Sequence, residues 1–195
     1  MKLKDIKRHF GRGYTKPKFK EGDIDLTHHE TIKSFRNIDM PQQRLFGSLY
    51  AGDTDLETLY GCPQWIEGNC DFEKTAITSL QHGPKFIGGY FSIDETEVSS
   101  FEGAPEHIGG DFYFFNTKIT SLHGIQNHIK YIGGSIGFDP TVTNLLGLFF
   151  IKGLTKVMID MGPIQKAFVK HLPTGDVHAC QEELIEAGYS MQAKF

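Results

Sequence analysis

The chain has 195 residues and a mass of 21.9 kDa, a length that fits one domain or one domain with a short appendage. Apolar residues make up 39% and charged residues 23%, which excludes a disordered chain, and no apolar run is long enough to cross a bilayer. The charged N-terminus is followed by no apolar stretch, so we expect no signal peptide, no membrane association and a cytoplasmic protein.

Charge divides the chain into a basic beginning and an acidic remainder. The first 20 residues, here called the basic arm, carry a net charge of +7, so the total of -4 leaves -11 for the rest. Phe10 and Tyr14 lie between the basic side chains of the arm. These basic side chains are Lys2, Lys4, Lys7, Arg8, Arg12, Lys16, Lys18 and Lys20.

Three interpretations of the basic arm stay open. Cations interleaved with aromatic rings suit nucleic-acid binding, although the acidic remainder would repel a polyanion. The arm could instead dock on an acidic face of its own molecule or of a neighbouring copy, which in the second case would build a homo-oligomer. The third interpretation is a solvated tail or an N-terminal cap.

A period of 21 residues runs through the middle of the chain. The segment 83–93 returns as 104–114, and each copy has a proline followed by two adjacent glycines. Three further columns keep this spacing: Leu45, Ile66, Ile87 and Ile108; Leu59, Leu80, Phe101 and Leu122; and Thr54, Thr75, Thr96 and Thr117. Agreement among independent columns identifies a structural repeat.

One repeat cannot bury its apolar side alone, so consecutive repeats must stack as the coils of a solenoid. We expect about six coils over residues 21–160, each giving one strand to a parallel sheet, with short irregular outer connections. The buried threonine hydroxyls are expected to bond backbone groups in the adjoining turn. The paired glycines are expected to supply the backbone freedom of the turn before each strand.

The pattern within one repeat resembles a known family. Phe112, Phe114, Thr117, Ile119 and Leu122 follow the spacing of the leucine-rich repeat, with threonine where that family usually has asparagine. The paired glycines and preceding proline resemble the variant carried by many tailed-phage proteins. The resemblance covers roughly residues 20 to 160. It implies a leucine-rich-repeat-like fold and a phage protein that acts in host takeover or counter-defence inside an infected bacterial cell.

The last 35 residues, 161–195, are predicted to form a helical C-terminal cap. Ile164, Phe168 and Leu172 recur every four residues after Pro163, which indicates an amphipathic helix. A second helix is predicted to begin after Asp176 as N-cap and to end at Gly188. Cys180 is expected to pack within this cap.

The outward positions of each strand make a candidate binding surface on the concave side of the solenoid, because solenoids bind mainly through their sheet. Three such positions in each of six coils give 18 positions, of which seven are acidic, four are aromatic and none is basic. The predicted partner-binding residues are Asp23, Asp25, Tyr50, Asp71, Glu73, Tyr90, Asp94, Asp111, Tyr113, Phe115 and Asp139. They fit a basic protein surface, and the alternative is a solvated acidic face that keeps the chain soluble.

We find no motif for metal binding, phosphate binding or catalysis in the sequence. The three cysteines lack metal-type spacing and argue for a reducing compartment, and neither histidine-rich spot, 28–30 or 178–180, has a partner pair at zinc spacing. The paired glycines recur in every repeat and lack the lysine of a phosphate loop. We therefore expect no metal, no cofactor and no enzymatic activity.

Two functional hypotheses follow from these patterns. The first is a non-enzymatic interaction protein that binds a host or phage protein with a basic surface through the acidic and aromatic side chains of the sheet. The alternative is a structural or virion-associated protein that self-assembles through its basic arm. Nucleic-acid binding by the arm ranks below both.

Overall fold

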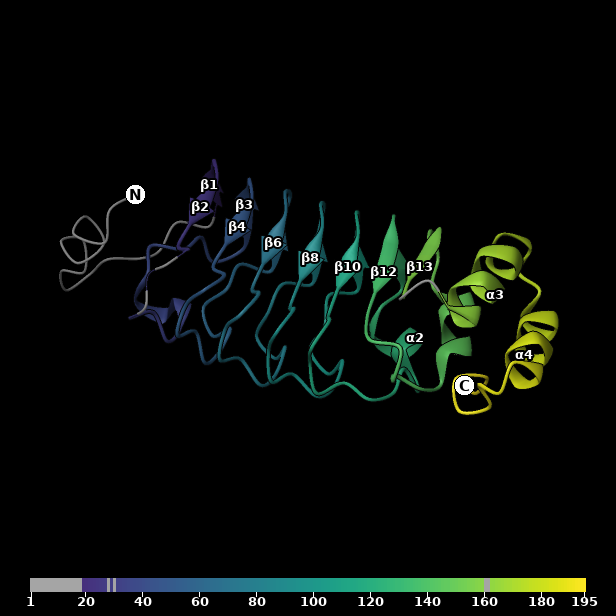
Figure 1. Cartoon of the computed structure of the whole chain (residues 1–195). Coiled ribbons are helices and arrows are strands. Elements are labelled where there is room, and N and C mark those ends of the chain that lie inside the picture. Colours follow the sequence, from purple (N-terminus) through teal and green to yellow (C-terminus); the bar gives the residue numbers. More distant parts are fainter. Residues whose placement is uncertain (1–18, 28, 30, 160–161) are drawn as a thin grey trace.

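The computed structural model describes residues 19–27, 29, 31–159 and 162–195. The described chain winds into a parallel β-solenoid with two helices stacked at its C-terminal end (Figure 1). Seven strands in the longer sheet mark seven coils, where the repeat predicted about six. The predicted fold class, a repeat solenoid with a helical C-terminal cap, is confirmed.

The first six coils contribute to two parallel sheets, whereas we expected one. The first sheet, formed just before the paired glycines, contains β1 (Phe19–Glu21), β3 (Arg44–Phe46), β5 (Trp65–Ile66), β7 (Phe86–Ile87), β9 (His107–Ile108) and β11 (Tyr131–Ile132). The second sheet follows the glycines and contains β2 (Ile24–Asp25), β4 (Leu49–Tyr50), β6 (Cys70–Asp71), β8 (Phe91–Ser92), β10 (Phe112–Tyr113), β12 (Ser135–Gly137) and β13 (Lys156–Met158). The strands of the first sheet bury at most one side chain each, so no apolar alternation reveals them in the sequence.

The core consists of columns of identical register. Leu45, Ile66, Ile87, Ile108 and Ile132 of the first sheet are fully buried, as are Leu49, Cys70, Phe91, Phe112 and Ile136 of the second. Phenylalanine rings stack from coil to coil, with centroids 5.3 Å apart for Phe91 and Phe112. Buried phenylalanines such as Phe72, Phe91 and Phe112 therefore fill the inside of the solenoid, where ring pairs add to the burial of apolar area.

The paired glycines allow the coils to stack closely. Our expectation that they supply backbone freedom in the turn before each strand was wrong. The backbone of Gly88 and Gly109 does not adopt a positive φ. A Cβ at Gly109 would overlap the carbonyl oxygen of Gly88 in the preceding coil, and a Cβ at Gly88 would overlap that of Glu67. Glycine is therefore needed because adjacent coils approach too closely for any side chain.

The buried threonines bond within their own coil rather than across to the adjoining turn. The Thr54 hydroxyl donates to the Ala51 carbonyl oxygen at 2.8 Å, and Thr75 donates to Phe72 in the same way at 2.8 Å. The residue just before each threonine adopts a left-handed conformation without being glycine. These residues are Asp53, Lys74, Glu95 and Asn116, with φ between 52° and 55°. The threonine thus closes a tight corner in each coil.

The outer connections are short, as expected. They contain the 3-10 helices η1 (Phe35–Asn37) and η2 (Leu145–Phe150) and the four-residue helix α2 (Ile125–His128). None of the helices in the described ranges is long and apolar enough to cross a membrane.

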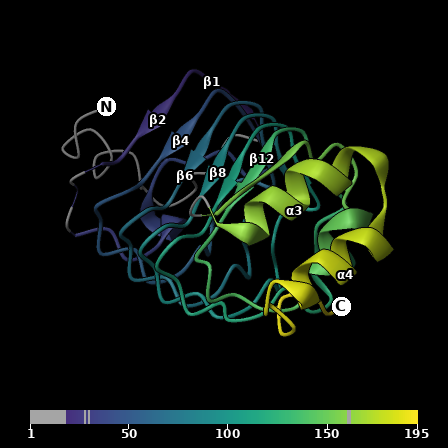
Figure 2. The same ribbon diagram turned by 45° about the vertical axis from the view of Figure 1, so that its right-hand side comes forward.

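The C-terminal cap consists of α3 (Pro163–His171), η3 (Leu172–Thr174) and α4 (Val177–Glu186), which pack side by side at the end of the sheets (Figure 2). Helix α3 contacts β13, and its buried Phe168 ring lies 5.6 Å from that of Phe149. Asp176 caps α4 as predicted, since its carboxylate accepts the Ala179 N–H at 3.0 Å. Cys180 is buried in the cap, and burial raises the pKa of its thiol to about 12.

Candidate interaction face

The predicted binding residues share one face of the second sheet. The parallel register places Tyr50 beside Asp71, Asp71 beside Ser92, and Ser92 beside Tyr113. Asp25 and Gly137 extend this column at its two ends, and the other predicted residues lie two positions before or after a residue of the column. We call this surface, with all eleven predicted residues and the seven uncharged positions between them, the acidic face.

Six of the seven carboxylates on the acidic face accept a backbone N–H. Four reach an adjacent coil: Asp23 to Ser48 at 2.7 Å, Asp94 to Phe115 at 2.6 Å, Asp111 to Ser135 at 2.6 Å and Asp139 to Asn116 at 2.7 Å. Two close local turns: Asp25 to Thr27 and Asp71 to Glu73, each at 3.0 Å. These bonds explain why acids recur here, and they also hold the carboxylates in fixed positions.

The uncharged positions continue this system of bonds. The Ser48 hydroxyl accepts the Asn69 N–H at 3.1 Å, and the Asn69 amide oxygen accepts the Tyr90 N–H at 3.1 Å. Side chains from Asp23 onwards therefore link four successive coils. These side chains therefore hold successive coils together and also form the surface of the face.

Two of the tyrosines on the acidic face donate hydrogen bonds to its carboxylates. The Tyr113 hydroxyl donates to Asp111 at 2.8 Å, and the Tyr90 hydroxyl donates to Asp71 at 3.4 Å. The Phe115 ring lies over Gly137, where a Cβ would come within 2.7 Å of the ring. All three rings are half-buried, so part of each is covered by the face itself.

Ionisation differs between neighbouring carboxylates on the acidic face. Burial, reinforced by the charges of Glu73 and Asp71, raises the pKa of Asp94 to about 6. Asp111 is also partly buried, but bonds from Ser135 and Tyr113 outweigh burial and hold its pKa below the ordinary value. Ionisation is therefore disfavoured at Asp94 and favoured at Asp111.

Within the described residues, Lys74 and Lys156 lie at the border of this face, and Lys156 in β13 pairs with Ser135. Lys74 lies 3.6 Å from the Glu73 carboxylate and 3.8 Å from that of Glu95. Lys20 is in β1, where its ammonium donates to the Asp39 carbonyl oxygen at 3.3 Å. The other basic residues predicted for the arm lie outside the described residues.

The sequence interpretation missed a ladder of stacked rings on the outside of the first sheet. We call it the aromatic ladder; it contains Trp65, Phe86, His107 and Tyr131. Their centroids are 3.7, 4.5 and 4.4 Å apart in that order, and the ring planes are nearly parallel. The signal was present, because the first three lie 21 residues apart, each directly before a buried isoleucine.

Neighbouring groups cover the ring faces of the aromatic ladder. The Arg44 guanidinium lies 4.8 Å from the Trp65 ring at one end. Gly153, with φ of 80°, lies against Tyr131 at the other, where a Cβ would come within 2.6 Å of the ring. Only ring edges remain exposed, so the ladder is not a platform on which bases or sugars could stack.

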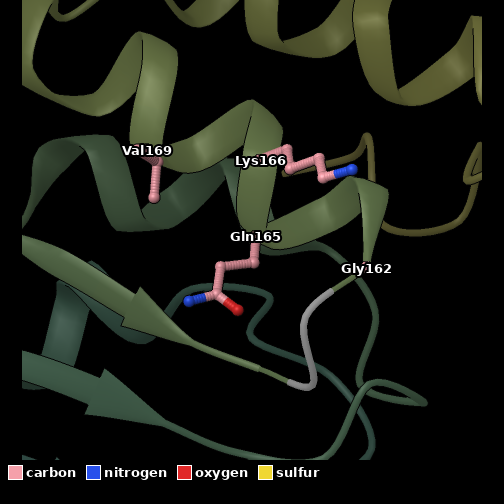
Figure 3. A pocket seen from close by; sticks show the side chains of 4 residues that line it. All are labelled: Gly162, Gln165, Lys166 and Val169. Carbon is pink, nitrogen blue, oxygen red and sulfur yellow. The ribbon is translucent and has the colours of Figure 1, made fainter.

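Two pockets lie away from both surfaces. One of about 230 Å³ is lined by Gly162, Gln165, Lys166 and Val169 at the start of α3 (Figure 3). The other, of about 340 Å³, is lined by Arg36, Gln42, Tyr60, Gly61 and Cys62 on the outer side. Within the described ranges, no three His, Cys, Asp or Glu side chains come together as metal ligands.

Comparisons with family models, curated proteins and solved structures gave no match to this chain. The resemblance to phage-type leucine-rich repeats stays a prediction.

Proposed function

We propose that the acidic face binds a basic segment of another protein and that the chain works by binding rather than by catalysis. The observation that supports this proposal is the set of carboxylates held by backbone amides on a face with no basic side chain among its 18 positions. A cationic partner meets charges that are already in place. Binding then orders few side chains of this protein and loses little conformational entropy.

The aromatic residues of the acidic face favour a protein partner over a simple cation. Tyrosine offers apolar area together with a polar tip, and it is enriched at the centre of protein interfaces. Tyr90 and Tyr113 lie next to Asp71 and Asp111, so a lysine or arginine could pack its aliphatic part on a ring while its charge meets a carboxylate. The proposed partner is rich in lysine and arginine.

The biological setting that we propose follows from the resemblance to phage-type repeats. In that setting the chain is made in the cytoplasm of an infected bacterial cell, and its partner is a host or phage protein. Occupation of a basic surface on a host protein would serve host takeover or counter-defence.

Affinity purification of the tagged full chain from its producing cells at moderate salt tests this function. The matched variant is Asp71→Asn, Glu73→Gln and Asp94→Asn, which removes three charges but keeps side-chain oxygens that accept the same amides. We expect one stoichiometric protein with a basic surface, recovered at least about tenfold less by the variant.

A second set of substitutions controls for overall charge. Asp55→Asn, Glu97→Gln and Glu106→Gln remove the same number of charges from exposed positions outside the acidic face, and they should leave recovery unchanged. Equal losses in the two sets would reject the face as the binding site. Recovery of the protein only with itself, as an oligomer of defined mass, would favour the self-assembly alternative.

A further inference from the structure

The larger of the two pockets, on the outer side of the solenoid, has a basic and polar lining. It has a volume of about 340 Å³ and is lined by Arg36, Gln42, Tyr60, Gly61 and Cys62. Among the described residues that line it, none is acidic. Its volume falls within the range of small-molecule sites, about 300 to 1,000 Å³. The pocket is therefore large enough for a small ligand, and the charge of its lining disfavours a cation.

The pocket lies where one connection of the repeat is longer than the next. Ile38 and Cys62 occupy equivalent corners, since each N–H donates to the carbonyl oxygen three residues earlier. Five residues, 39–43, lead from Ile38 to β3, whereas two residues, 63–64, lead from Cys62 to β5. Gln42 belongs to the longer connection. Insertions into one repeat of a solenoid often carry its binding residues.

The wall of the pocket is fixed by packing of the two coils. Met40 of the longer connection is fully buried, and the Lys20 ammonium donates to the Asp39 carbonyl oxygen at 3.3 Å. Gly61, with φ of 93°, lies against the backbone of the first coil, where a Cβ would come within 3.0 Å of the Arg36 nitrogen. The pocket is therefore preformed, so a ligand would order little of the backbone on binding.

The polar side chains of the lining have hydrogen-bond donors to spare. Within the described ranges, the Arg36 guanidinium and the Gln42 amide make no side-chain hydrogen bond or ion pair. The Arg36 guanidinium instead lies 5.6 Å from the centre of the Tyr60 ring, which packs edge-on against His82 with centroids 5.4 Å apart. Stacking on a ring restricts the guanidinium and leaves its N–H groups for a ligand.

Two nearby groups that would repel an anion are neutralised. Glu57, three residues before Tyr60, pairs with Lys33 at 2.5 Å. Burial raises the pKa of the Cys62 thiol, so this thiol stays uncharged at neutral pH. Among the described lining residues, Arg36 therefore carries the one charge that a ligand meets.

We propose that this pocket binds a small molecule that carries a carboxylate or phosphate group. Arg36 donates two parallel N–H groups to two oxygens of the anion, the pairing for which a planar guanidinium is suited. Gln42 and Tyr60 supply further N–H and O–H donors in the same lining. The site lies outside the acidic face and needs no partner protein, so it does not depend on the proposed function.

Nuclear magnetic resonance of the full chain during addition of inorganic phosphate or of citrate tests the site. At about 0.15 M salt, charges more than about 8 Å apart are largely screened. We expect saturable shifts of the Gly61 amide and the Arg36 side-chain signals, with a Kd of about 10 mM or tighter for at least one anion. The anion that binds more tightly identifies the preferred group. No saturable shift with either anion up to about 50 mM would overturn the proposal.

A pair of variants with equal loss of charge locates the binding. Arg36→Gln should weaken binding of the anion about tenfold or more, because it removes the charged donors. Lys118→Gln removes one positive charge from an exposed position outside the pocket and should keep binding within about twofold of the wild type. Equal losses in both variants would assign the shifts to overall charge and overturn the site.

A second pair of variants leaves Arg36 in place. Gln42→Glu adds a carboxylate that competes with the anion for Arg36, so it should weaken binding about tenfold or more. Gln43→Glu makes the same change at the next residue, which is not among the described lining residues, and should weaken binding much less. Both glutamines are exposed, so both variants are expected to fold. Equal binding by the wild type and Gln42→Glu would also overturn the proposal.

Discussion

Asp94 shows how the acidic face adjusts the ionisation of a single residue. Burial, assisted by the charges of Glu73 and Asp71, raises its pKa from 3.8 to about 6, while the Phe115 N–H that it accepts acts in the opposite direction. Between these two values the folded chain keeps a proton that the unfolded chain has released. The contribution of Asp94 to stability is therefore largest below about pH 4 and is lost as the pH rises towards 6.

Asp94→Asn should make stability less dependent on pH. The amide keeps an acceptor for the Phe115 N–H but carries no charge, so the variant should match the wild type near pH 4 and exceed its stability at pH 7. Urea midpoints at pH 4, 5, 6 and 7 measure this difference. Asp94→Ala is the control: it loses the acceptor and should cost about 1 kcal/mol at pH 7 relative to the Asn variant. A constant gap between wild type and Asn variant across this range would contradict the assignment.

The acids of the face were found from the sequence because the repeat register places them outside the buried columns. Their amide partners could not be found in this way, since Asp94 bonds a residue 21 positions later and Asp139 one 23 positions earlier. Whether a carboxylate reaches the coil before or after it depends on how the coils stack. The contact between the Phe115 ring and Gly137 could not be predicted for the same reason, because it also depends on how the coils stack.

The paired glycines determine whether neighbouring coils can stack. Gly109→Ala should destabilise the protein by about 2 kcal/mol or more, because its Cβ would overlap the Gly88 carbonyl oxygen, a backbone atom that cannot rotate away. Gly188→Ala is the matched control, since its surroundings are open and only its φ of 88° opposes a side chain, at a cost of about 1 kcal/mol. Urea unfolding followed by circular dichroism compares them, and equal losses would mean that coil contact is not the reason for the glycine.

The aromatic ladder stabilises the first sheet through its ring faces. Phe86→Leu keeps much of the apolar area but loses two stacked neighbours, Trp65 and His107, so we expect a loss of about 1 to 3 kcal/mol. Phe150→Leu removes an exposed ring outside the ladder with one ring neighbour, Phe195, and should change stability by less than about 1 kcal/mol. Circular dichroism during urea unfolding measures both variants. A Phe86 effect no larger than that of Phe150 would show that stacking contributes little.

At the element scale, the sequence predicted the strands of the second sheet and both cap helices, because their apolar spacing and capping residues are local signals. It did not predict the first sheet. The strand Trp65–Ile66 buries one side chain, so no apolar alternation marks it, whereas Phe112 and Phe114 alternate in the second sheet. The ring column formed by Trp65, Phe86 and His107 was visible at 21-residue spacing, but its parallel stacking depends on the distance between coils.

Over the whole molecule, stability should spread from neighbour to neighbour, since each coil of a solenoid contacts mainly the next. Phe168→Ala in α3 removes a fully buried ring and should cost the cap about 3 to 5 kcal/mol. We expect amide exchange to rise first in β13 and β12, while β4 and β6 keep their protection. Val169→Ala, at the next and exposed position, is the control and should leave exchange unchanged. A uniform rise in all coils would instead indicate one global unfolding unit.

The regular spacing of coils makes the length of this protein adjustable by whole repeats. Removal of residues 84–104 would join Gly83 to Pro105 and bring Trp65 beside His107 and Cys70 beside Phe112, so every column would close again in register. Each gain or loss of 21 codons would change the span of both sheets by one strand spacing, about 4.8 Å. Recombination between repeats within the gene could thus fit the protein to partners of different size without redesign of its core.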